Sequence, residues 1–188
     1  MKKNDYPTLY IEKLNEDAEL PKRAHATDSG FDLYANNIKK VYAHGGGNGE
    51  RLLDGTVEDS AQATKNLKLR LTDDNLELQY LERALIGTGI RATVGPGYEI
   101  QVRPRSGLAL KRGLTVLNSP GTVDEAYRGE ICVIVVNNSR KAQSIEPSER
   151  IAQLVVAPVI LPEIKLVENL PEAASDRAEG GFGSSGEK

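Results

Sequence analysis

The sequence predicts an all-β fold, a distorted jelly-roll barrel of short strands with one short helix and a flexible C-terminal arm. Its apolar segments are short, and they either alternate with polar residues or are rich in β-branched residues. Clusters of turn-forming residues separate these segments. A helical period is sustained only at residues 107–113 and in the middle of a polar insertion. The regular alternation of strands and helices that defines an α/β protein is therefore not expected.

Four strands can be placed in order along the second half of the chain. "YEIQVRP" (98–104) alternates, and "EICVIVVNN" (130–138) is a continuous apolar run of the kind that forms a buried strand. "RIAQLVVAPVIL" (150–161) is a second such run with a proline break, and "PEIKLVEN" (162–169) alternates again. Turns are expected at "GPG", "NSPGT" and "EPSE", and the helix is expected at "GLALKRG".

Residues 44 to about 78 interrupt this pattern. They open with "HGGGNGE", continue as a polar, acidic run and end in "NLKLRLTDDNLELQY", which is typical of a hairpin with "TDDN" as its turn. We interpret the segment as a surface insertion, because long loops add little closure entropy. No catalytic residue can be recognised in it, and a protein partner of the insertion is unknown.

The composition limits the classes of function. The chain has 188 residues, of which 39% are hydrophobic and 27% charged, as in one soluble domain with a core. Aromatic residues make up 5%, tryptophan is absent and the net charge is -3, which disfavours a nucleic-acid-binding surface. No segment has the length and apolar content of a membrane span. We expect a soluble, intracellular, cytoplasmic protein with neither a nucleic-acid nor a membrane partner.

Positive charge is concentrated locally. Residues 103–112 contain four basic residues and no acid, whereas residues 54–82 contain seven acids and three bases. An anion site is therefore expected near 103–112. The single cysteine, Cys132, lies in the apolar run "ICVIVV", so we expect a small buried side chain and no disulfide within the chain. His25 and His44 have no evident partners, and neither is assigned a catalytic role.

Five short segments are rich in residue types that carry chemistry. The first, "HATDSGFDLYA", places Asp28, Ser29 and Asp32 around a glycine before a strand. The same pattern is typical of a turn whose side chains cap the backbone, with no functional role. The second, "RPRSGLALKRGL", can present the guanidinium of Arg105, a hydroxyl and free backbone N–H groups to phosphate oxygens. It is equally compatible with a strand that leads into a helix with Ser106 as its N-cap.

The third segment, "NSPGTVDEAYRGEI", has a tight turn followed by Asp124, which either orients a water for attack on phosphorus or only caps the turn. The fourth, "RIAQLVV", contains Gln153 as the only polar side chain of an apolar strand, facing either solvent or a site. The fifth is the tail "RAEGGFGSSGEK" (177–188), in which Arg177 and Phe182 lie among glycines and serines. Its composition alone is that of a flexible linker.

Together and in this order, the five segments resemble the five motifs of the trimeric deoxyuridine triphosphatase (dUTPase) family. The resemblance covers residues 23–42 and about 80–186, and its most specific parts are "PRSGLA", "NSPGTVDEAYRGE" and "GGFGSSG". It implies hydrolysis of dUTP to dUMP and pyrophosphate, which keeps uracil out of DNA and supplies dUMP for thymidylate synthesis. It also implies a homotrimer whose active sites are shared between subunits.

The resemblance assigns the central chemistry to the third motif. It implies that Asp124 orients the water that attacks the α-phosphorus. Tyr127 would pack against the deoxyribose, where a ribose 2′-hydroxyl would otherwise lie. Asn118 and the hairpin backbone around Thr122 and Val123 would recognise uracil and leave no room for a 5-methyl group.

The first, second and fourth motifs are implied to hold the triphosphate. Arg105, Ser106 and Gly107 would bind the phosphates and the bridging oxygen, and Gln153 would help to place the water. Ser106 and Gln153 therefore join the aspartate of the third motif as expected catalytic residues. Asp32 matches a carboxylate near the hydrated Mg²⁺, which it would contact through water. Phosphoryl transfer needs charge neutralisation and alignment more than covalent help, so this set is sufficient.

The tail acquires a role through the same resemblance. In the family the arm closes over the bound nucleotide, so residues 1–176 form the predicted barrel domain and residues 177–188 a mobile lid. The chain departs from the family in having Ala178 where a glycine is usual, and in its longer insertion. The lid residues implied to bind the nucleotide, with the aromatic ring stacked on uracil, are Arg177, Phe182, Gly183, Ser184 and Ser185.

Two other functions fit parts of the sequence. A dCTP deaminase shares the fold and part of the second motif but needs a deaminating glutamate, and the complete "NSPGTVDEAYRGE" favours hydrolysis of dUTP. A nucleotide-sensing regulatory protein would act through the insertion, since exposed insertions often bind partners. Such a sensor would not need a water-orienting Asp124 together with every phosphate ligand.

Overall fold

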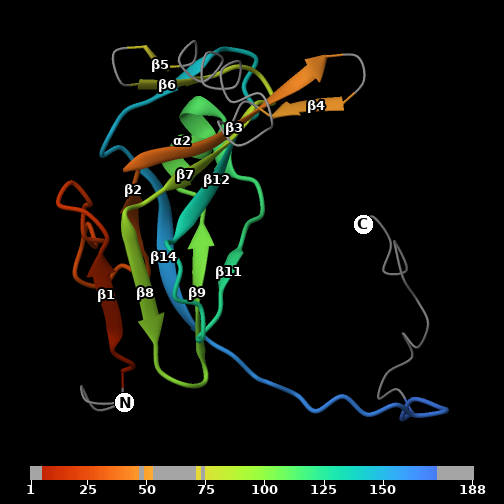
Figure 1. Ribbon diagram of the computed structural model, residues 1–188. Coiled ribbons are helices and arrows are strands. Elements are labelled where there is room, and N and C mark those ends of the chain that lie inside the picture. The colour runs from red at the N-terminus through yellow and green to blue at the C-terminus, as the bar shows by residue number, and fades with distance from the viewer. Residues whose placement is uncertain (1–5, 47–48, 53–70, 73–74, 173–188) are drawn as a thin grey trace, which may run out of the picture.

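The computed structural model describes residues 6–46, 49–52, 71–72 and 75–172, and these are folded mainly as β-structure (Figure 1). Every strand pairing in this part of the chain is antiparallel, and α2 (Ser106–Arg112) is the one α-helix among the described residues. The predicted all-β class with one short helix is confirmed. No helix within the described ranges is long and apolar enough to cross a membrane.

The described strands are divided among four sheets and do not join into a single closed barrel. The largest sheet has the order β10-β12-β7-β3-β4, and the second has the order β11-β9-β14-β2. The other two sheets are β1-β8 and β13-β6-β5. In chain order the strands are β1 Leu9–Lys13, β2 Phe31–Tyr34, β3 Asn37–Gly46, β4 Gly49–Leu52, β5 Leu71–Thr72, β6 Asn75–Leu78, β7 Arg83–Gly87, β8 Ile90–Val94, β9 Tyr98–Arg103, β10 Leu114–Val116, β11 Gly121–Val123, β12 Cys132–Asn137, β13 Gln143–Ile145 and β14 Arg150–Pro158.

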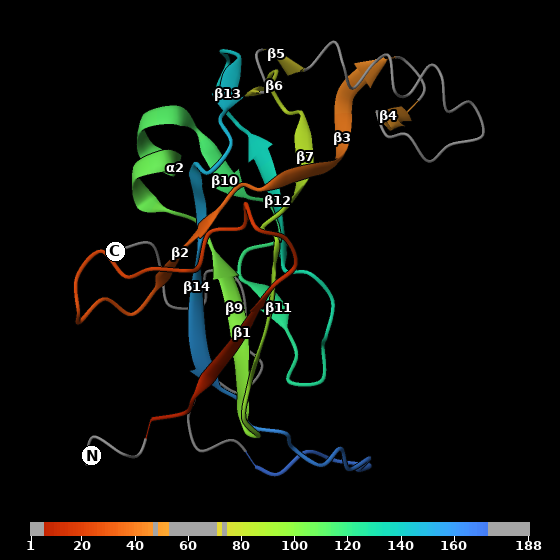
Figure 2. The same cartoon turned by 60° about the vertical axis from the view of Figure 1, so that its left-hand side comes forward.

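One hydrophobic core joins the sheets. In β7 and β8 the side chains alternate between buried and half-buried positions, as the two-residue period of a strand requires. Figure 2 shows α2 and the β13-β6-β5 sheet at one end of the body, while β1, β9 and β14 extend toward the other end. The largest side chains that are fully buried come from all four sheets and their connections: Leu33, Val41, Leu76, Leu78, Ile86, Ile90, Ile100, Leu114, Ile131, Val133, Ile145 and Leu154.

The hairpin predicted around "TDDN" is confirmed. Strands β5 and β6 pair with Leu71 opposite Leu76 and Thr72 opposite Asn75. Because β6 also pairs with β13 and buries Leu76 and Leu78 completely, the end of the predicted insertion belongs to the core. Residues 53–70, which make up most of the predicted insertion, lie outside the described residues.

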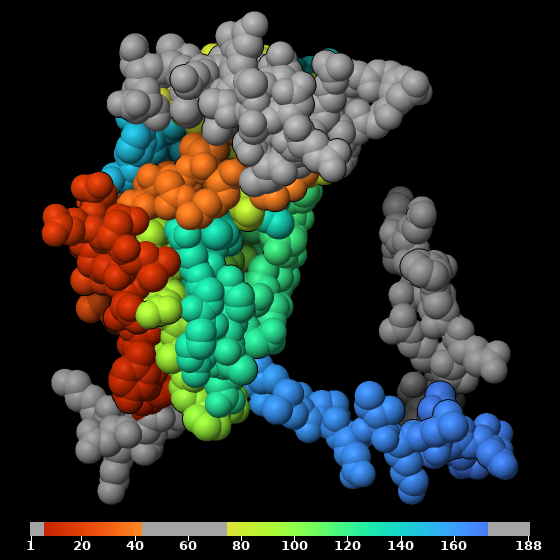
Figure 3. Space-filling model, viewed as in Figure 1, coloured from red at the N-terminus to blue at the C-terminus, as the bar shows by residue number. Residues whose placement is uncertain are grey.

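The strands expected within 98–104, 130–138 and 150–161 are present as β9, β12 and β14, but the strand expected at 162–169 is absent. Strand β14 ends at Pro158, and the chain then leaves the body, as Figure 3 shows. Ile164 and Leu166 are at least 95% exposed. An alternating segment becomes a strand only when another strand supplies hydrogen-bond partners, and within the described part of this chain none lies beside it.

Helix α2 connects β9 to β10. It ends at Gly113, whose φ of 67° is in the left-handed region and whose N–H donates to the carbonyl of Ala109. Arg105 occupies the N-cap position with an extended backbone, and no side chain caps the helix. The alternative with Ser106 as N-cap is therefore wrong. Ser106 is instead the first residue of the helix, and its hydroxyl is not used to cap it.

Candidate active site

A buried carboxylate links the first, second and fourth motifs. Asp32, in β2, is only 4% exposed. Its Oδ1 accepts hydrogen bonds from Arg105 Nε at 2.9 Å and from Gln153 Nε2 at 3.4 Å, and its Oδ2 accepts one from Arg150 Nη1 at 3.3 Å. A buried charge is tolerated only when it is paired and hydrogen-bonded, and these three donors satisfy that requirement.

The sheet register explains why these residues meet. Gln153 of β14 lies opposite Asp32 on one side and opposite Arg103 on the other, so the end of β9 delivers Arg105 to the same place. Arg150 and Gln153 are three positions apart, which would put their side chains on opposite faces of a regular strand. The register shifts between Arg150 and Ala152, and such an irregularity changes the face that a side chain takes.

The donors around Asp32 do not fit a direct metal ligand. Both carboxylate oxygens already face guanidinium groups. Among the described residues, no group of three or more His, Cys, Asp or Glu side chains could hold a metal ion. The contact through water that the family resemblance implies stays a prediction.

The second motif presents an open surface beside this cluster. The Arg105 side chain is a quarter exposed, and its Nη1 also donates to the carbonyl of Arg150 at 3.3 Å. Ser106 and Gly107 are exposed in the first turn of α2. A Cβ added at Gly107 would meet no atom within 4 Å, so packing within the described chain does not explain the glycine. An approach by another molecule would explain it.

The third motif forms the tip of β11 and the loop that follows. Asn118 and Thr122 are exposed, and Val123 is half-buried. Asp124 is exposed, its carbonyl accepts the N–H of Tyr127 at 3.0 Å, and no hydrogen bond to its carboxylate is found in the described residues. The turn is therefore made by the backbone, and the carboxylate does not serve as its cap. The alternative in which the side chain of Asp124 only caps the turn is therefore wrong.

The loop after Asp124 is fixed by its own side chains. Tyr127 donates from its hydroxyl to the carbonyl of Glu130 at 3.0 Å. Arg128 Nη1 donates to the carbonyls of Glu125 and Tyr127 at 2.5 Å and 2.8 Å. Thr93 Oγ1 donates to the same Glu125 carbonyl at 3.0 Å, which ties the loop to β8.

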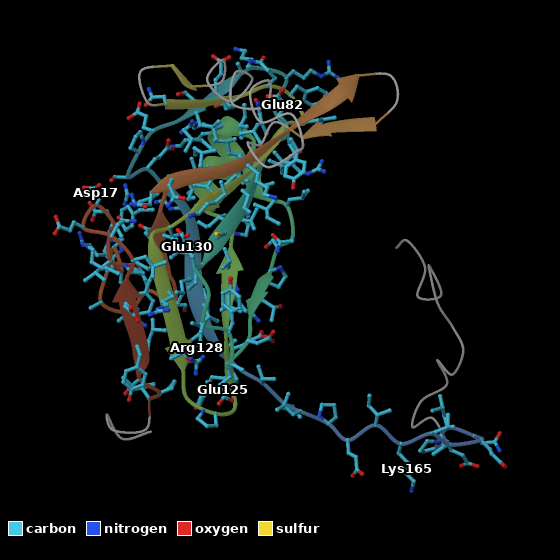
Figure 4. All side chains as sticks on the ribbon, in the orientation of Figure 1. Asp17, Glu82, Glu125, Arg128, Glu130 and Lys165 are labelled. Atoms are coloured by element: carbon cyan, nitrogen blue, oxygen red, sulfur yellow. The ribbon has the colours of Figure 1, made fainter. Side chains whose placement is uncertain are left out.

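Glu130 anchors the far end of this loop near the middle of the body (Figure 4). Its carboxylate contacts Lys39 Nζ at 2.7 Å and accepts the N–H of Gly89 at 2.8 Å and an amide hydrogen of Asn37 at 3.3 Å. Burial alone raises the pKa of Glu130, but the attraction and hydrogen bonds of Lys39, Gly89 and Asn37 outweigh it and hold the pKa below its usual value. The carboxylate is therefore ionised at neutral pH.

Cys132 follows this anchor and is half-buried. Burial, with the neighbouring charge of Glu130, raises the pKa of its thiol. The side chain is thus less buried than expected, but a protonated thiol is a poor nucleophile, in keeping with the expectation that Cys132 is not one.

The two groups of site residues lie apart within one chain. Gln153 and the Asp32 cluster are opposite Arg103, whereas Val123 is opposite Ile100. Three residues along a strand correspond to about 10 Å, and Asp124 lies further on in the same direction. Figure 4 shows Glu125 near the end of the body that lies opposite α2, consistent with this separation. Residues Arg177, Phe182, Gly183, Ser184 and Ser185 lie outside the described residues.

Three members of these networks, Arg150, Glu130 and Lys39, were not recognised in the sequence. Arg150 opens an apolar strand, and only the shifted register brings it to Asp32. Glu130 and Lys39 are 91 positions apart, and only the fold makes them partners. The one local signal was an acid directly before the apolar run of β12, an unusual position for an unpaired charge.

The chain is similar to known proteins in sequence and in fold. A family model described as dUTPase matches residues 67–186. The deoxyuridine 5'-triphosphate nucleotidohydrolase of Hydrogenobaculum sp. (strain Y04AAS1) is 41% identical over 180 residues, which are 96% of this chain and 99% of that protein. The chain therefore belongs to the dUTPase family, and the expectation drawn from the five motifs is confirmed.

Solved structures show the same fold. The Staphylococcus bacteriophage 80alpha dUTPase with dUPNHPP has a TM-score of 0.66 at 26% identity and covers 95% of this chain and 98% of its own. A mutant dUTPase from phage phi11 of S. aureus, described with a structural Mg(II) ion, has a TM-score of 0.61 at 22% identity and covers 88% and 99%. The chain thus shares the jelly-roll fold of this family.

Replacing Glu130 with Gln should make stability less dependent on pH. The folded-state pKa of Glu130 lies below the ordinary value of 4.5, so the ionised carboxylate stabilises the fold above pH 4.5, and this stabilisation is lost as the pH falls through the folded pKa. The thermal unfolding midpoint of E130Q should be below that of the wild type at neutral pH, and the difference should shrink on acidification.

Glu16→Gln is the matched control, because Glu16 is exposed and its carboxylate makes no hydrogen bond in the described part of the chain. Its midpoint should follow the wild type at every pH. A deficit of E130Q that stays constant on acidification would contradict the ion pair with Lys39.

Proposed function

We propose that the chain hydrolyses dUTP to dUMP and pyrophosphate, as a dUTP diphosphatase. Membership of the dUTPase family supports this activity. The observation that carries the mechanism is the carboxylate of Asp124, which is exposed, ionisable and without a partner in the described chain. The reaction keeps uracil out of DNA and supplies dUMP for thymidylate synthesis.

Asp124 accepts the proton of a water whose oxygen attacks the α-phosphorus. The bond from that phosphorus to the bridging oxygen of the β-phosphate breaks, and pyrophosphate leaves with the electron pair. Gln153 helps to place the water, and Ser106 donates to the bridging oxygen. A positioned general base with donors at the leaving group is what phosphoryl transfer requires.

Phosphate binding is assigned to the basic surface beside Asp32. Arg105, held by Asp32 at 2.9 Å, presents the remainder of its guanidinium to the phosphates, together with Ser106 and Gly107. Of the lid residues, Arg177 would add positive charge at the phosphates and Phe182 would stack on the uracil ring. The other lid residues assigned to nucleotide binding are Gly183, Ser184 and Ser185.

Base and sugar are assigned to β11 and the turn that precedes it. Asn118 is exposed, and β11 is the edge strand of its sheet, so the backbone of Thr122 and Val123 can offer donors and acceptors to the edge of uracil. Tyr127, held over its own loop, packs against the deoxyribose. This arrangement favours a small base without a 5-methyl group and a sugar without a 2′-hydroxyl.

Magnesium is assigned to the substrate. Because both oxygens of Asp32 face guanidinium groups, Mg²⁺ is expected to arrive chelated by the triphosphate, and Asp32 contacts it through water at most. When bound, the ion neutralises charge on the phosphate oxygens.

Two features of the single chain support a homotrimer with shared sites. The Asp32 cluster and Asp124 lie at different positions along β9, too far apart for one phosphate group to contact both. Residues 160–172 carry apolar side chains that are largely exposed, such as Ile164 and Leu166, and these need a neighbouring chain to become buried.

The alternative functions are weaker. The complete third motif favours dUTP hydrolysis over deamination of dCTP. For a regulatory role, phage 80alpha dUTPase is described as controlling the transfer of virulence genes. For this chain, such a role through the insertion stays a hypothesis that deletion of residues 53–70 would test by partner binding.

Asp124→Asn should lower the turnover of dUTP by about 10² to 10⁴-fold, the usual contribution of a positioned general base. Binding of a non-hydrolysable imido analogue of dUTP, measured by calorimetry, should be nearly unchanged. Glu125→Gln is the control, because Glu125 is exposed on the same loop and only its carbonyl is used. Near-normal turnover in D124N would remove Asp124 from the mechanism.

Sedimentation equilibrium should give a mass of about 61 kDa, three times the 20.4 kDa of one chain. Truncation after residue 159 should shift the protein toward smaller species, because it removes the exposed apolar segment. A full-length chain that sediments at the mass of one subunit would contradict the trimer and the shared sites.

A further inference from the structure

The ring of Tyr127 lies directly over Gly129. A Cβ added at Gly129 would be 2.3 Å from the Tyr127 hydroxyl oxygen and 2.5 Å from Cζ. Separations under 3.0 Å essentially never occur for a real Cβ. The backbone of Gly129 is not in the left-handed region, so its φ does not demand glycine. The requirement for glycine at this position therefore comes from the ring.

The backbone beneath the ring has little freedom to yield. Glu130, the next residue, is held by Lys39 and by the N–H of Gly89, and the N–H of Ile131 donates to the carbonyl of Ile90 at 2.9 Å. On the other side, Arg128 and Thr93 bind the Glu125 carbonyl. A methyl group at position 129 would therefore displace the ring and leave the loop in place.

Within the described part of the chain, a single polar contact holds the ring. Its hydroxyl donates to the carbonyl of Glu130 at 3.0 Å, and Tyr127 as a whole is 46% exposed. One hydrogen bond on a half-exposed ring is weak compared with a steric overlap of this size. Displacement would therefore break the bond and move the surface that the ring offers to a ligand.

We infer that Gly129 is a specificity-determining positioning residue: it allows Tyr127 to lie flat on its loop, and so sets how strongly the enzyme distinguishes a deoxyribose from a ribose. The inference rests on the proposed function, in which Tyr127 packs against the sugar. Gly129 itself does not contact the substrate. It affects discrimination between the two sugars only through the position of the Tyr127 ring.

Gly129→Ala tests this role through the ratio of kcat/KM for dUTP to kcat/KM for UTP. The ratio should fall by about tenfold or more, the range that one misplaced apolar contact commonly costs in discrimination. Gly95→Ala is the matched control, because a Cβ there meets no atom within 4 Å and its φ is unstrained. Thermal unfolding midpoints of the two variants should agree within a few degrees, which shows that the loop has stayed folded.

The same substitution made in a Tyr127→Ala variant distinguishes a positioning role of Gly129 from a general loss of activity. In Tyr127→Ala, the further change of Gly129 to Ala should leave the ratio unaltered, because the ring through which it acts is gone. A wild-type ratio in G129A, or an equal further loss in the Y127A background, would overturn the inference. A wild-type enzyme that does not hydrolyse dUTP would instead overturn the proposed function.

Discussion

The pairing of β9 with β11 on one edge and with β14 on the other fixes where every described part of the site lies. Along β14 the register brings Gln153 to Asp32, and the end of β9 brings Arg105 to the same carboxylate. Because β11 runs antiparallel to β9, Asp124, which follows β11, lies away from that cluster. Strand β9 thus positions both halves of the site, the Asp32 cluster and the loop of Asp124, and separates them within one chain.

Each half is rigid for a different reason. The half around Asp32 is centred on a buried carboxylate, and the guanidinium groups of Arg105 and Arg150 pair with its two oxygens. The half proposed to hold base and sugar includes the loop after β11, which is tied down by Thr93 and by Glu130 with Lys39. Preorganisation of both halves lowers the reorganisation needed when substrate binds.

Local patterns predicted most of the strands, but not the long-range contacts. β12 and the "TDDN" hairpin were evident because the periodicity and turn residues that define them are local. Arg150 was missed because only the register shift in β14 turns it toward Asp32. The strand expected at 162–169 failed because its alternation says nothing about whether a partner exists in the same chain.

The central claim is that Asp124 of one chain serves the Arg105 cluster of another, and mixing two inactive variants tests it most directly. Chains carrying Asp124→Asn and chains carrying Arg105→Ala are unfolded together in equal amounts, refolded and assayed for dUTP hydrolysis. Each half of a shared site is intact in half of the chains, so about a quarter of the sites should be wild type, with activity restored to match. Activity no higher than that of the separate variants would place both halves in one chain and contradict the account.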